Sequence, residues 1–92
     1  QVRNEGIYLG AMDEQSIEIL FNLGSTLRED HKVNFDYKKR GFGKHLKQAE
    51  KQNVSHILLM GENERNENAI WVKNLQTKEE KTIPLETLIQ EL

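Results

Sequence analysis

The amino-acid sequence predicts a single α/β domain in which a mixed β-sheet is covered by helices on both faces. Three observations lead to this prediction. The chain has 92 residues, which is enough for one hydrophobic core of modest size. Short apolar runs typical of buried strands alternate with stretches whose apolar residues recur at helical spacing. After the third strand the pattern changes to a strand hairpin and a last helix.

The N-terminal part of the chain predicts a strand and then a helix. Residues 6–12 form a short, mostly apolar run that ends at Asp13, a residue type that caps helices. The next stretch predicts an amphipathic helix of about 17 residues, with an apolar face made of Ile17, Leu20, Phe21, Gly24 and Leu27. Because Gly24 lies on this inward face and lets the helix approach the sheet closely, we expect Gly24→Leu to push the helix away.

A second strand and a second helix are predicted next. Val33, Phe35 and Tyr37 alternate with polar residues, which is typical of a strand at an outer position in the sheet. A turn at 39–41 leads into a helix whose apolar face is predicted to carry Phe42, Leu46 and Ala49. Its exposed stripe holds Lys44, Lys47 and Lys51. Like charges at this spacing repel one another, so the stripe favours an anionic partner.

The C-terminal part predicts a central strand, a hairpin and a closing helix. Residues 56–60 form a buried strand, and residues 61–68 form a polar connection rich in turn residues. Ile70 and Val72 then alternate with Trp71 and Lys73, and a second run at 81–83 completes an antiparallel hairpin. Pro84 ends that strand and begins a helix whose apolar face carries Leu85, Leu88, Ile89 and Leu92.

The composition excludes several classes of function. The longest apolar run, at 57–60, is far too short to span a membrane or to serve as a signal peptide. The absence of cysteine excludes a disulfide framework and thiolate chemistry, and it fits a cytoplasmic location. His31, His45 and His56 lack the spacing of a metal-binding motif. This spacing leads us to expect no metal site in the domain. No nucleophile is paired with a base, so we also expect no catalytic residue in it.

The charge of the chain is unevenly distributed. Residues 38–51 hold one acid, Glu50, and six cations, Lys38, Lys39, Arg40, Lys44, Lys47 and Lys51. This stretch therefore carries +5 and the rest of the chain −7, within a net charge of −2. A local basic cluster is typical of a contact with phosphates, but a solvated helix face has the same composition. The backbone at the start of the second helix offers room for one phosphate without a full phosphate-loop motif.

Two further features leave alternatives open. Glu62, Glu64 and Glu67 in the connection at 61–68 either keep that loop soluble or accept hydrogen bonds from the edges of bases. Trp71 lies out of phase with its apolar neighbours and therefore points to the opposite face of the sheet. It either packs under a helix or offers a stacking surface to an unpaired base.

Four blocks of the chain, in order, resemble the C-terminal anticodon-binding domain of bacterial histidyl-tRNA synthetase. They are residues 6–12, 34–51, 58–64 and 69–77. Threonyl-, prolyl- and glycyl-tRNA synthetases carry the same type of domain. The sequences Asp-Tyr-Lys-Lys-Arg, Lys-Gln-Ala-Glu-Lys and Val-Lys-Asn-Leu-Gln-Thr look most like the histidyl branch.

The resemblance implies a fold, an activity and partners. The fold is a three-layer α/β/α sandwich with a mixed five-stranded sheet of order 2-1-3-4-5, in which strand 4 is antiparallel. Residues 1–92 would form one anticodon-binding domain, a fragment of a longer histidine–tRNA ligase that is not catalytic by itself. No cofactor is expected in this domain, whereas ATP and Mg²⁺ are expected in a separate catalytic domain. The expected partners are the anticodon stem-loop of tRNA(His), the catalytic domain and, for the full-length protein, a second subunit.

The resemblance also implies which residues meet the tRNA. They come from the loop after the second strand, the loop after the third strand and the fourth strand, and are Lys38, Lys39, Arg40, Gly41, Lys44, Glu62, Glu64 and Lys73. The cations would neutralise phosphates and the glutamates would read base edges. Three alternatives remain: a regulatory or protein-interaction domain of a histidyl-tRNA synthetase-like paralogue, the equivalent domain of a threonyl-, prolyl- or glycyl-tRNA synthetase, and a small enzyme that acts on a phosphate-bearing substrate.

Overall fold

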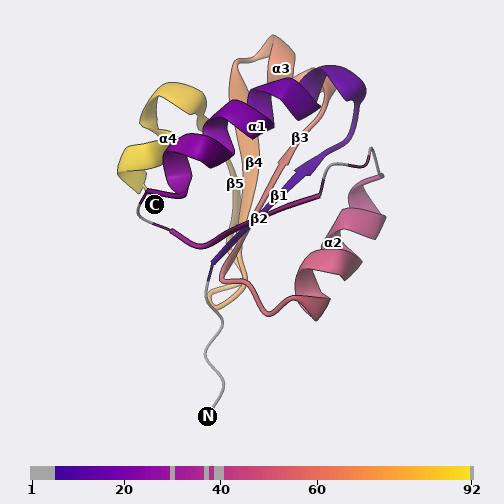
Figure 1. Cartoon of the computed structure of the whole chain (residues 1–92), viewed down its shortest axis with the longest axis vertical. Coiled ribbons are helices and arrows are strands. Elements are labelled where there is room, and N and C mark those ends of the chain that lie inside the picture. Colours follow the sequence, from indigo (N-terminus) through magenta and orange to yellow (C-terminus); the bar gives the residue numbers. More distant parts are fainter. Residues whose placement is uncertain (1–5, 30, 37, 39–40, 92) are drawn as a thin grey trace.

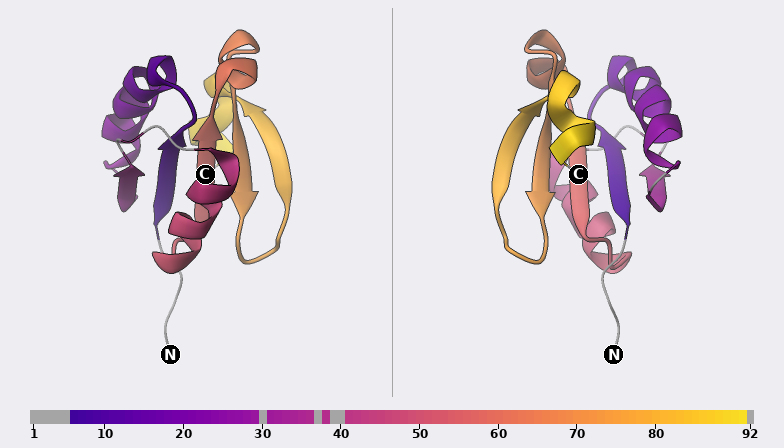
Figure 2. Two further views of the ribbon diagram at one scale, coloured as in Figure 1. Left: turned by 90° about the vertical axis from the view of Figure 1, so that its right-hand side faces the viewer. Right: turned by 90° about the vertical axis from the view of Figure 1, so that its left-hand side faces the viewer.

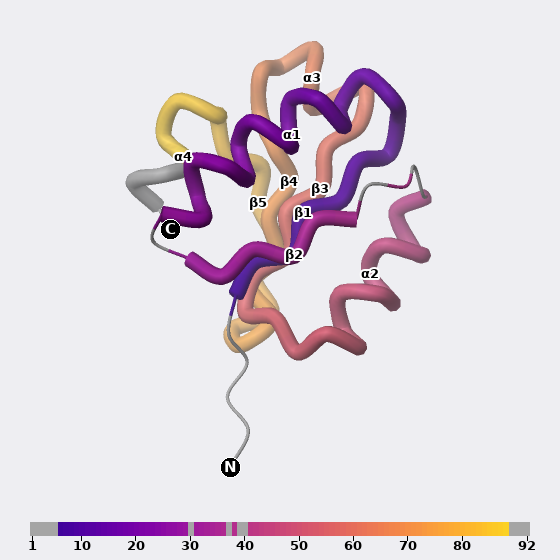
Figure 3. Tube along the Cα trace, viewed as in Figure 1, coloured from indigo at the N-terminus to yellow at the C-terminus, as the bar shows by residue number. Residues whose placement is uncertain are grey.

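Five strands and four helices follow one another in the computed structural model, which describes residues 6–29, 31–36, 38 and 41–91 (Figure 1). In chain order they are β1 (Ile7–Ala11), α1 (Glu14–Leu27), β2 (Val33–Asp36), α2 (Phe42–Lys51), β3 (His56–Met60), α3 (Glu62–Asn66), β4 (Ala69–Asn74), β5 (Glu80–Pro84) and α4 (Leu85–Glu91). Figure 3 traces this path as a tube. All the predicted strands and helices are present, and α3 is an addition to them.

The strands form one mixed sheet of order β2-β1-β3-β4-β5. β1 runs parallel to both β2 and β3, so that Leu9 lies between Phe35 and Leu58. β4 is antiparallel to β3 and to β5, which confirms the predicted order and the direction of strand 4. Because β1, β2 and β3 point the same way, their C-terminal ends and the starts of α1, α2 and α3 lie at one edge of the sheet, here called the carboxyl edge.

The helices form layers on the two faces of the sheet. In Figure 2, α2 lies in front of the sheet in one view and α4 in the other. The core on the side of α1 and α4 is built around the buried residues Ile7, Leu9, Leu20, Leu27, Leu58, Met60, Ile70 and Leu88. The core on the side of α2 consists of Tyr8, Ala49, Val54, Ile57 and Leu59. β1 is buried along its whole length because both of its faces are covered.

Helix α1 confirms two predictions and corrects a third. The side chain of Asp13 caps the helix by accepting a hydrogen bond from the Ser16 amide at 2.9 Å. A Cβ atom added to Gly24 would lie 3.1 Å from Cδ1 of Leu9, so this glycine does allow the close approach. The prediction that Phe21 faces inward is wrong, because its side chain is 49% exposed. Phe21 lies on the flank of the helix, where its ring is 6.5 Å from that of Phe35 on the edge strand.

Helix α2 turns the predicted Leu46 and Ala49 toward the core, but not Phe42. Its exposed lysine stripe is confirmed, but Phe42 is 42% exposed rather than buried. The buried positions are His45 and Ala49, four residues apart. The imidazole therefore occupies the inward position that periodicity alone assigned to Phe42.

The connection between β3 and β4 is partly helical, which corrects the predicted loop. Helix α3 begins after Gly61, whose amide donates to Oε1 of Glu64 at 2.8 Å. In the hairpin that follows, Oδ1 of Asn74 accepts from the amides of Gln76 and Thr77 at 2.9 and 3.2 Å. Pro84 ends β5 and α4 begins at Leu85, as predicted. Three side chains that are predicted to face inward lie outside the part of the chain that the structure describes, namely those of Tyr37, Ile89 and Leu92.

Candidate functional site

The carboxyl edge of the sheet gathers most of the described candidate residues. Lys38 lies two positions after the last residue of β2, and Gly41 and Lys44 lie at the start of α2. Glu62 and Glu64 lie in α3, which follows β3 at the same edge. The predicted site residues Lys39 and Arg40 lie outside the described residues.

Lys73 is separated from the other candidates. In the sheet it pairs with Ile57, the second residue of β3, and therefore lies near the end of the sheet opposite to the carboxyl edge. Its side chain is half-buried, and Nζ lies 3.9 Å from Oε2 of Glu80 on β5. The structure thus places Lys73 in a second location, where part of its charge is balanced within the sheet.

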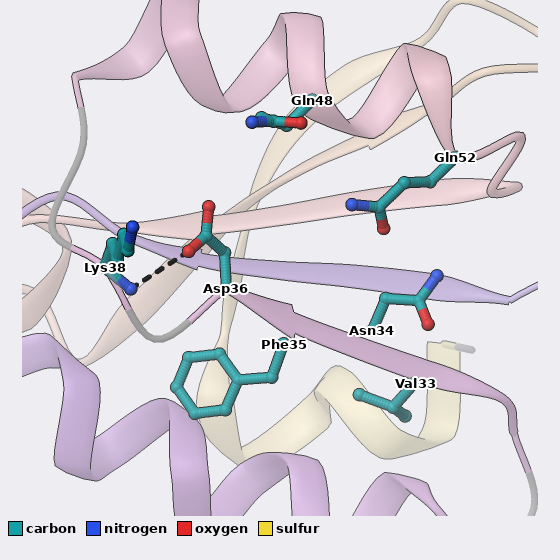
Figure 4. Close-up of a pocket in the computed structure, with 7 residues that line it drawn as sticks. All are labelled: Val33, Asn34, Phe35, Asp36, Lys38, Gln48 and Gln52. Atoms are coloured by element: carbon teal, nitrogen blue, oxygen red, sulfur yellow. Dashed lines mark hydrogen bonds between the residues drawn. The ribbon is translucent and has the colours of Figure 1, made fainter.

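An open groove of about 670 Å³ lies between the edge strand β2 and helix α2. It is lined by Val33, Asn34, Phe35, Asp36, Lys38, Gln48 and Gln52. Figure 4 shows Gln52 extending from α2 toward β2 and Gln48 beside the same helix, with Asn34 and Asp36 pointing back toward the helix. Carboxamide groups both donate and accept hydrogen bonds, so three of them beside a carboxylate and an ammonium group suit a polar, planar ligand.

The sequence-based site did not include the amides of this groove. Two signals were available for them. Asn34 and Asp36 occupy the polar face of the alternating strand, and Gln48 and Gln52 are spaced four apart, as residues on one helical face are. What the sequence did not reveal was that α2 leaves the polar face of the edge strand open.

A turn at the end of β2 directs the chain past the groove. Oδ1 of Asp36 accepts a hydrogen bond from the backbone amide of Lys38 at 2.9 Å, as the dashed line in Figure 4 shows. The exposed side chain of Lys38 therefore stands where the strand ends.

A buried polar network lies behind the groove. Oη of Tyr8 is 2.8 Å from Nδ1 of His45 and donates to Oδ2 of Asp36 at 3.2 Å. Nε2 of His45 lies 2.7 Å from the carbonyl oxygen of Ala11, and the tyrosine and histidine are fully buried. Sequence reasoning missed this network. A tyrosine within an aliphatic strand was a signal, since a buried hydroxyl needs a partner.

Helix α3 is attached to the start of α1 by an ion pair. Nη2 of Arg65 donates to Oδ2 of Asp13 at 2.6 Å, and both side chains are half-buried. The arginine, by this hydrogen bond, lowers the pKa of Asp13 below its usual value. Glu62 is exposed, whereas Glu64 is half-buried and uses one oxygen on the Gly61 amide. The pair therefore fixes the short helix that carries both glutamates.

Trp71 packs in the interior of the fold. Its half-buried ring lies against the core on the α2 side and meets the ring of Phe42 edge-on, with centroids 4.8 Å apart. This position favours the packing interpretation of Trp71 over the stacking one. The more exposed partner of the pair is Phe42, at the start of α2.

The described residues form neither a metal cluster nor a membrane span. Among them, no three His, Asp or Glu side chains are grouped to hold a metal ion. His56 lies apart from the carboxyl edge, next to the hydroxyl of Ser55 at 2.9 Å, and burial lowers its pKa. None of the described helices is long and apolar enough to cross a membrane.

Comparison with known proteins identifies the family. The family model described as "Anticodon binding domain" matches residues 6–92. The chain belongs to the anticodon-binding domain family. Its relatives include histidine–tRNA ligases of Campylobacter concisus, 46% identical over 88 residues, and Sulfurovum, 41% identical over 85 residues. The matches cover 96% and 92% of this anticodon-binding domain but only 22% and 21% of the ligases, so the chain spans about a fifth of their length.

Solved structures show the same fold. The domain matches apo histidyl-tRNA synthetase of S. aureus with a TM-score of 0.83 and 29% identity, over 97% of this chain and 23% of that one. It also matches histidyl-tRNA synthetase of Nostoc (TM-score 0.84, 21% identity, 96% and 20% of the chains). The RNA-binding domain of a Cryptosporidium parvum threonyl-tRNA synthetase shares the fold at 19% identity and a TM-score of 0.82, over 96% and 22%. These neighbours confirm the predicted α/β architecture.

Proposed function

We propose that this anticodon-binding domain belongs to a histidine–tRNA ligase and holds the anticodon stem-loop of tRNA(His). The observation that supports this most is the 46% identity with a histidine–tRNA ligase over 96% of the chain. Aminoacylation, with its ATP and Mg²⁺, would take place in a separate catalytic domain of the longer protein. The same proposal includes a homodimeric full-length ligase in the cytoplasm, where bacterial translation occurs.

The basic residues near the carboxyl edge would provide the affinity. Lys38 and Lys44 are exposed, and the stripe of Lys47 and Lys51 continues along α2. Cations at these positions suit the phosphates of a folded RNA loop, and they would fix its register without reading its sequence. Lys39 and Arg40, which lie outside the described residues, remain candidates for the same role on the basis of the sequence.

The groove and α3 would provide base discrimination. Unpaired anticodon bases expose their Watson–Crick edges, which have both donors and acceptors. The side-chain amides of Asn34, Gln48 and Gln52 match such edges because they also have both. Glu62 adds an exposed acceptor, and Glu64 adds one that is partly engaged in capping.

Binding to short RNAs tests this function. The affinity of the chain is measured for a stem-loop with the anticodon GUG and for one with another triplet, over a range of salt concentrations. We expect tighter binding to GUG and a steep fall in affinity as salt increases. Equal affinity for both triplets would contradict the histidyl assignment and would favour either the paralogue interpretation or another synthetase.

A matched pair of variants locates the interface. Lys44→Ala removes a cation near the carboxyl edge, and Lys78→Ala removes one from the turn between β4 and β5. Lys44→Ala should lower the slope of log affinity against log salt by about 0.7 to 0.9, the value for one released counterion. Lys78→Ala should leave the slope unchanged. The reverse result would mean that the phosphates are held at the end of the sheet where Lys73 lies and not at the carboxyl edge.

A further inference from the structure

The buried network described above joins the two elements that flank the groove. The hydroxyl of Tyr8 on β1 contacts Asp36 at the end of β2 and His45 in the first turns of α2, at 3.2 and 2.8 Å. His45 is in turn held to β1 by the carbonyl oxygen of Ala11, at 2.7 Å. One hydroxyl on β1 therefore bridges two consecutive elements, β2 and α2, across the turn that connects them.

The hydrogen-bonding chemistry makes the phenol oxygen the shared atom. A carbonyl oxygen only accepts, so Nε2 of His45 donates to Ala11. Tyr8 has one proton to donate. When Nδ1 of His45 carries a proton, the phenol oxygen accepts a hydrogen bond from it and donates its own proton to Asp36. When Nδ1 carries none, the phenol proton alternates between Asp36 and Nδ1. In both cases a phenylalanine at this position would serve neither.

Each end of this link continues to a cation of the candidate interface. Asp36 uses its other carboxylate oxygen to accept from the backbone amide of Lys38 at 2.9 Å. His45 directly follows Lys44, and its amide donates to the Gly41 carbonyl at 3.1 Å in the first turn of α2. The two lysines are both exposed, while the group that connects their segments is buried.

Apart from the edge-on contact of Phe42 with Trp71, the described residues at the start of α2 have few constraints. Its N-cap is Gly41, which has no side chain to cap the helix. A Cβ atom added to Gly41 or Gly43 would meet nothing within 4 Å. Because glycine is the residue that loses most conformational freedom on ordering, this turn needs an anchor from elsewhere in the fold. His45 is buried where such an anchor is required.

We propose that Tyr8 and His45 are positioning residues that set the spacing of Lys38 and Lys44 for two phosphates of the bound RNA. This inference rests on the proposed function and deepens it. A surface whose cations are already in place loses less conformational freedom on binding, so the network raises affinity without touching the ligand.

The test removes the hydroxyl and keeps the ring. Tyr8→Phe should weaken binding to the GUG stem-loop by about tenfold while leaving the salt slope unchanged, because no charge is lost. Ser55→Ala is the matched control, since it also removes a hydroxyl bond, at 2.8 Å to Gly6, near the other end of β1. The control should change affinity by less than twofold. His45→Gln is a second variant, which keeps a donor for Ala11 but lacks the Nδ1 link.

A double-mutant cycle separates positioning from a general loss of stability. If Tyr8 acts through the lysines, Tyr8→Phe should cost much less affinity in a Lys38→Ala, Lys44→Ala background than in the wild type. An equal loss in both backgrounds would overturn the proposal. So would wild-type affinity in folded Tyr8→Phe and His45→Gln.

Hydrogen exchange tests the positioning without RNA. Tyr8→Phe should accelerate exchange of the Lys38 and His45 amides by at least about threefold, and Ser55→Ala should not. Unchanged exchange at both amides would overturn the positioning role even if the chain binds no RNA. Absence of RNA binding together with accelerated exchange would instead contradict the proposed function and leave the positioning of the two segments standing.

Discussion

Gly10 provides the sharpest test of the packing around His45. A Cβ atom at this position would lie 2.6 Å from Nδ1 and 2.8 Å from both Cε1 and Cγ of the imidazole. The imidazole ring cannot move away from such a Cβ atom without losing a hydrogen bond, because Tyr8 and the Ala11 carbonyl hold its two nitrogens at 2.8 and 2.7 Å. Gly10→Ala must therefore either strain the backbone or break a buried hydrogen bond.

The expected cost follows from these two terms. Overpacking of a close-packed interior costs about 1 to 3 kcal/mol, and an unsatisfied buried polar group costs about the same. Because either event alone relieves the clash, we expect Gly10→Ala to lower the free energy of unfolding by about 1 to 3 kcal/mol. Urea unfolding can be followed by the fluorescence of Trp71, the single tryptophan, and by circular dichroism.

Two further variants make this reasoning refutable. Gly43→Ala is the control, because Gly43 lies in the same helix as His45 but has open space around it. This variant should be neutral or more stable by up to about 1 kcal/mol. His45→Ala removes the obstacle, so combining it with Gly10→Ala should cost at least about 1 kcal/mol less than the sum of the single changes. A loss below about 0.5 kcal/mol for Gly10→Ala, or strict additivity, would refute the steric argument.

Two other predictions concern helix α1. Asp13→Ala should lower the free energy of unfolding by about 1 to 2 kcal/mol at pH 7, and Asp13→Asn, which keeps the capping oxygen, by less. The folded protein holds the pKa of Asp13 below its usual value of 3.8, so the carboxylate stabilises the fold fully above that pH and progressively less as the pH falls through the folded pKa. The difference in free energy of unfolding between the wild type and Asp13→Ala should therefore shrink in strong acid, and an undiminished difference would contradict this. Gly24→Leu should lower the melting temperature by about 10 °C or more, because even the Cβ atom of the new side chain would lie 3.1 Å from Leu9. The control Ser25→Ala, at an exposed position, should have little effect. Equal melting temperatures for the two variants would show that the helix shifts freely.

The sequence predicted the topology because its signals are local. Buried strands appear as apolar runs, and Asp13 and Pro84 mark element boundaries through their own chemistry. The inward face of a helix is less local, since it depends on what lies opposite. Phe21 and Phe42 were therefore misassigned: each sits at the flank of its helix beside another aromatic ring.

Parts of the candidate site depend on contacts between residues that are distant in the chain. Helix α3 has only five residues, too few to show a period, and one of its anchors is the ion pair of Arg65 with Asp13. Tyr8 meets His45 across 37 positions. Such pairs cannot be found by spacing within one segment. The separate location of Lys73 likewise required the register of β4 against β3.

The position of Lys73 limits which ligands can use the whole set of candidate residues. β4 runs away from the carboxyl edge, and four residue steps separate Ala69 from Lys73. At about 3.4 Å per step, Lys73 lies roughly 14 Å down the strand. This distance exceeds the reach of one nucleotide, so Lys73 and the carboxyl edge must address different nucleotides of any bound strand. RNAs that are progressively shortened from one end should therefore lose the contribution of one location before the other.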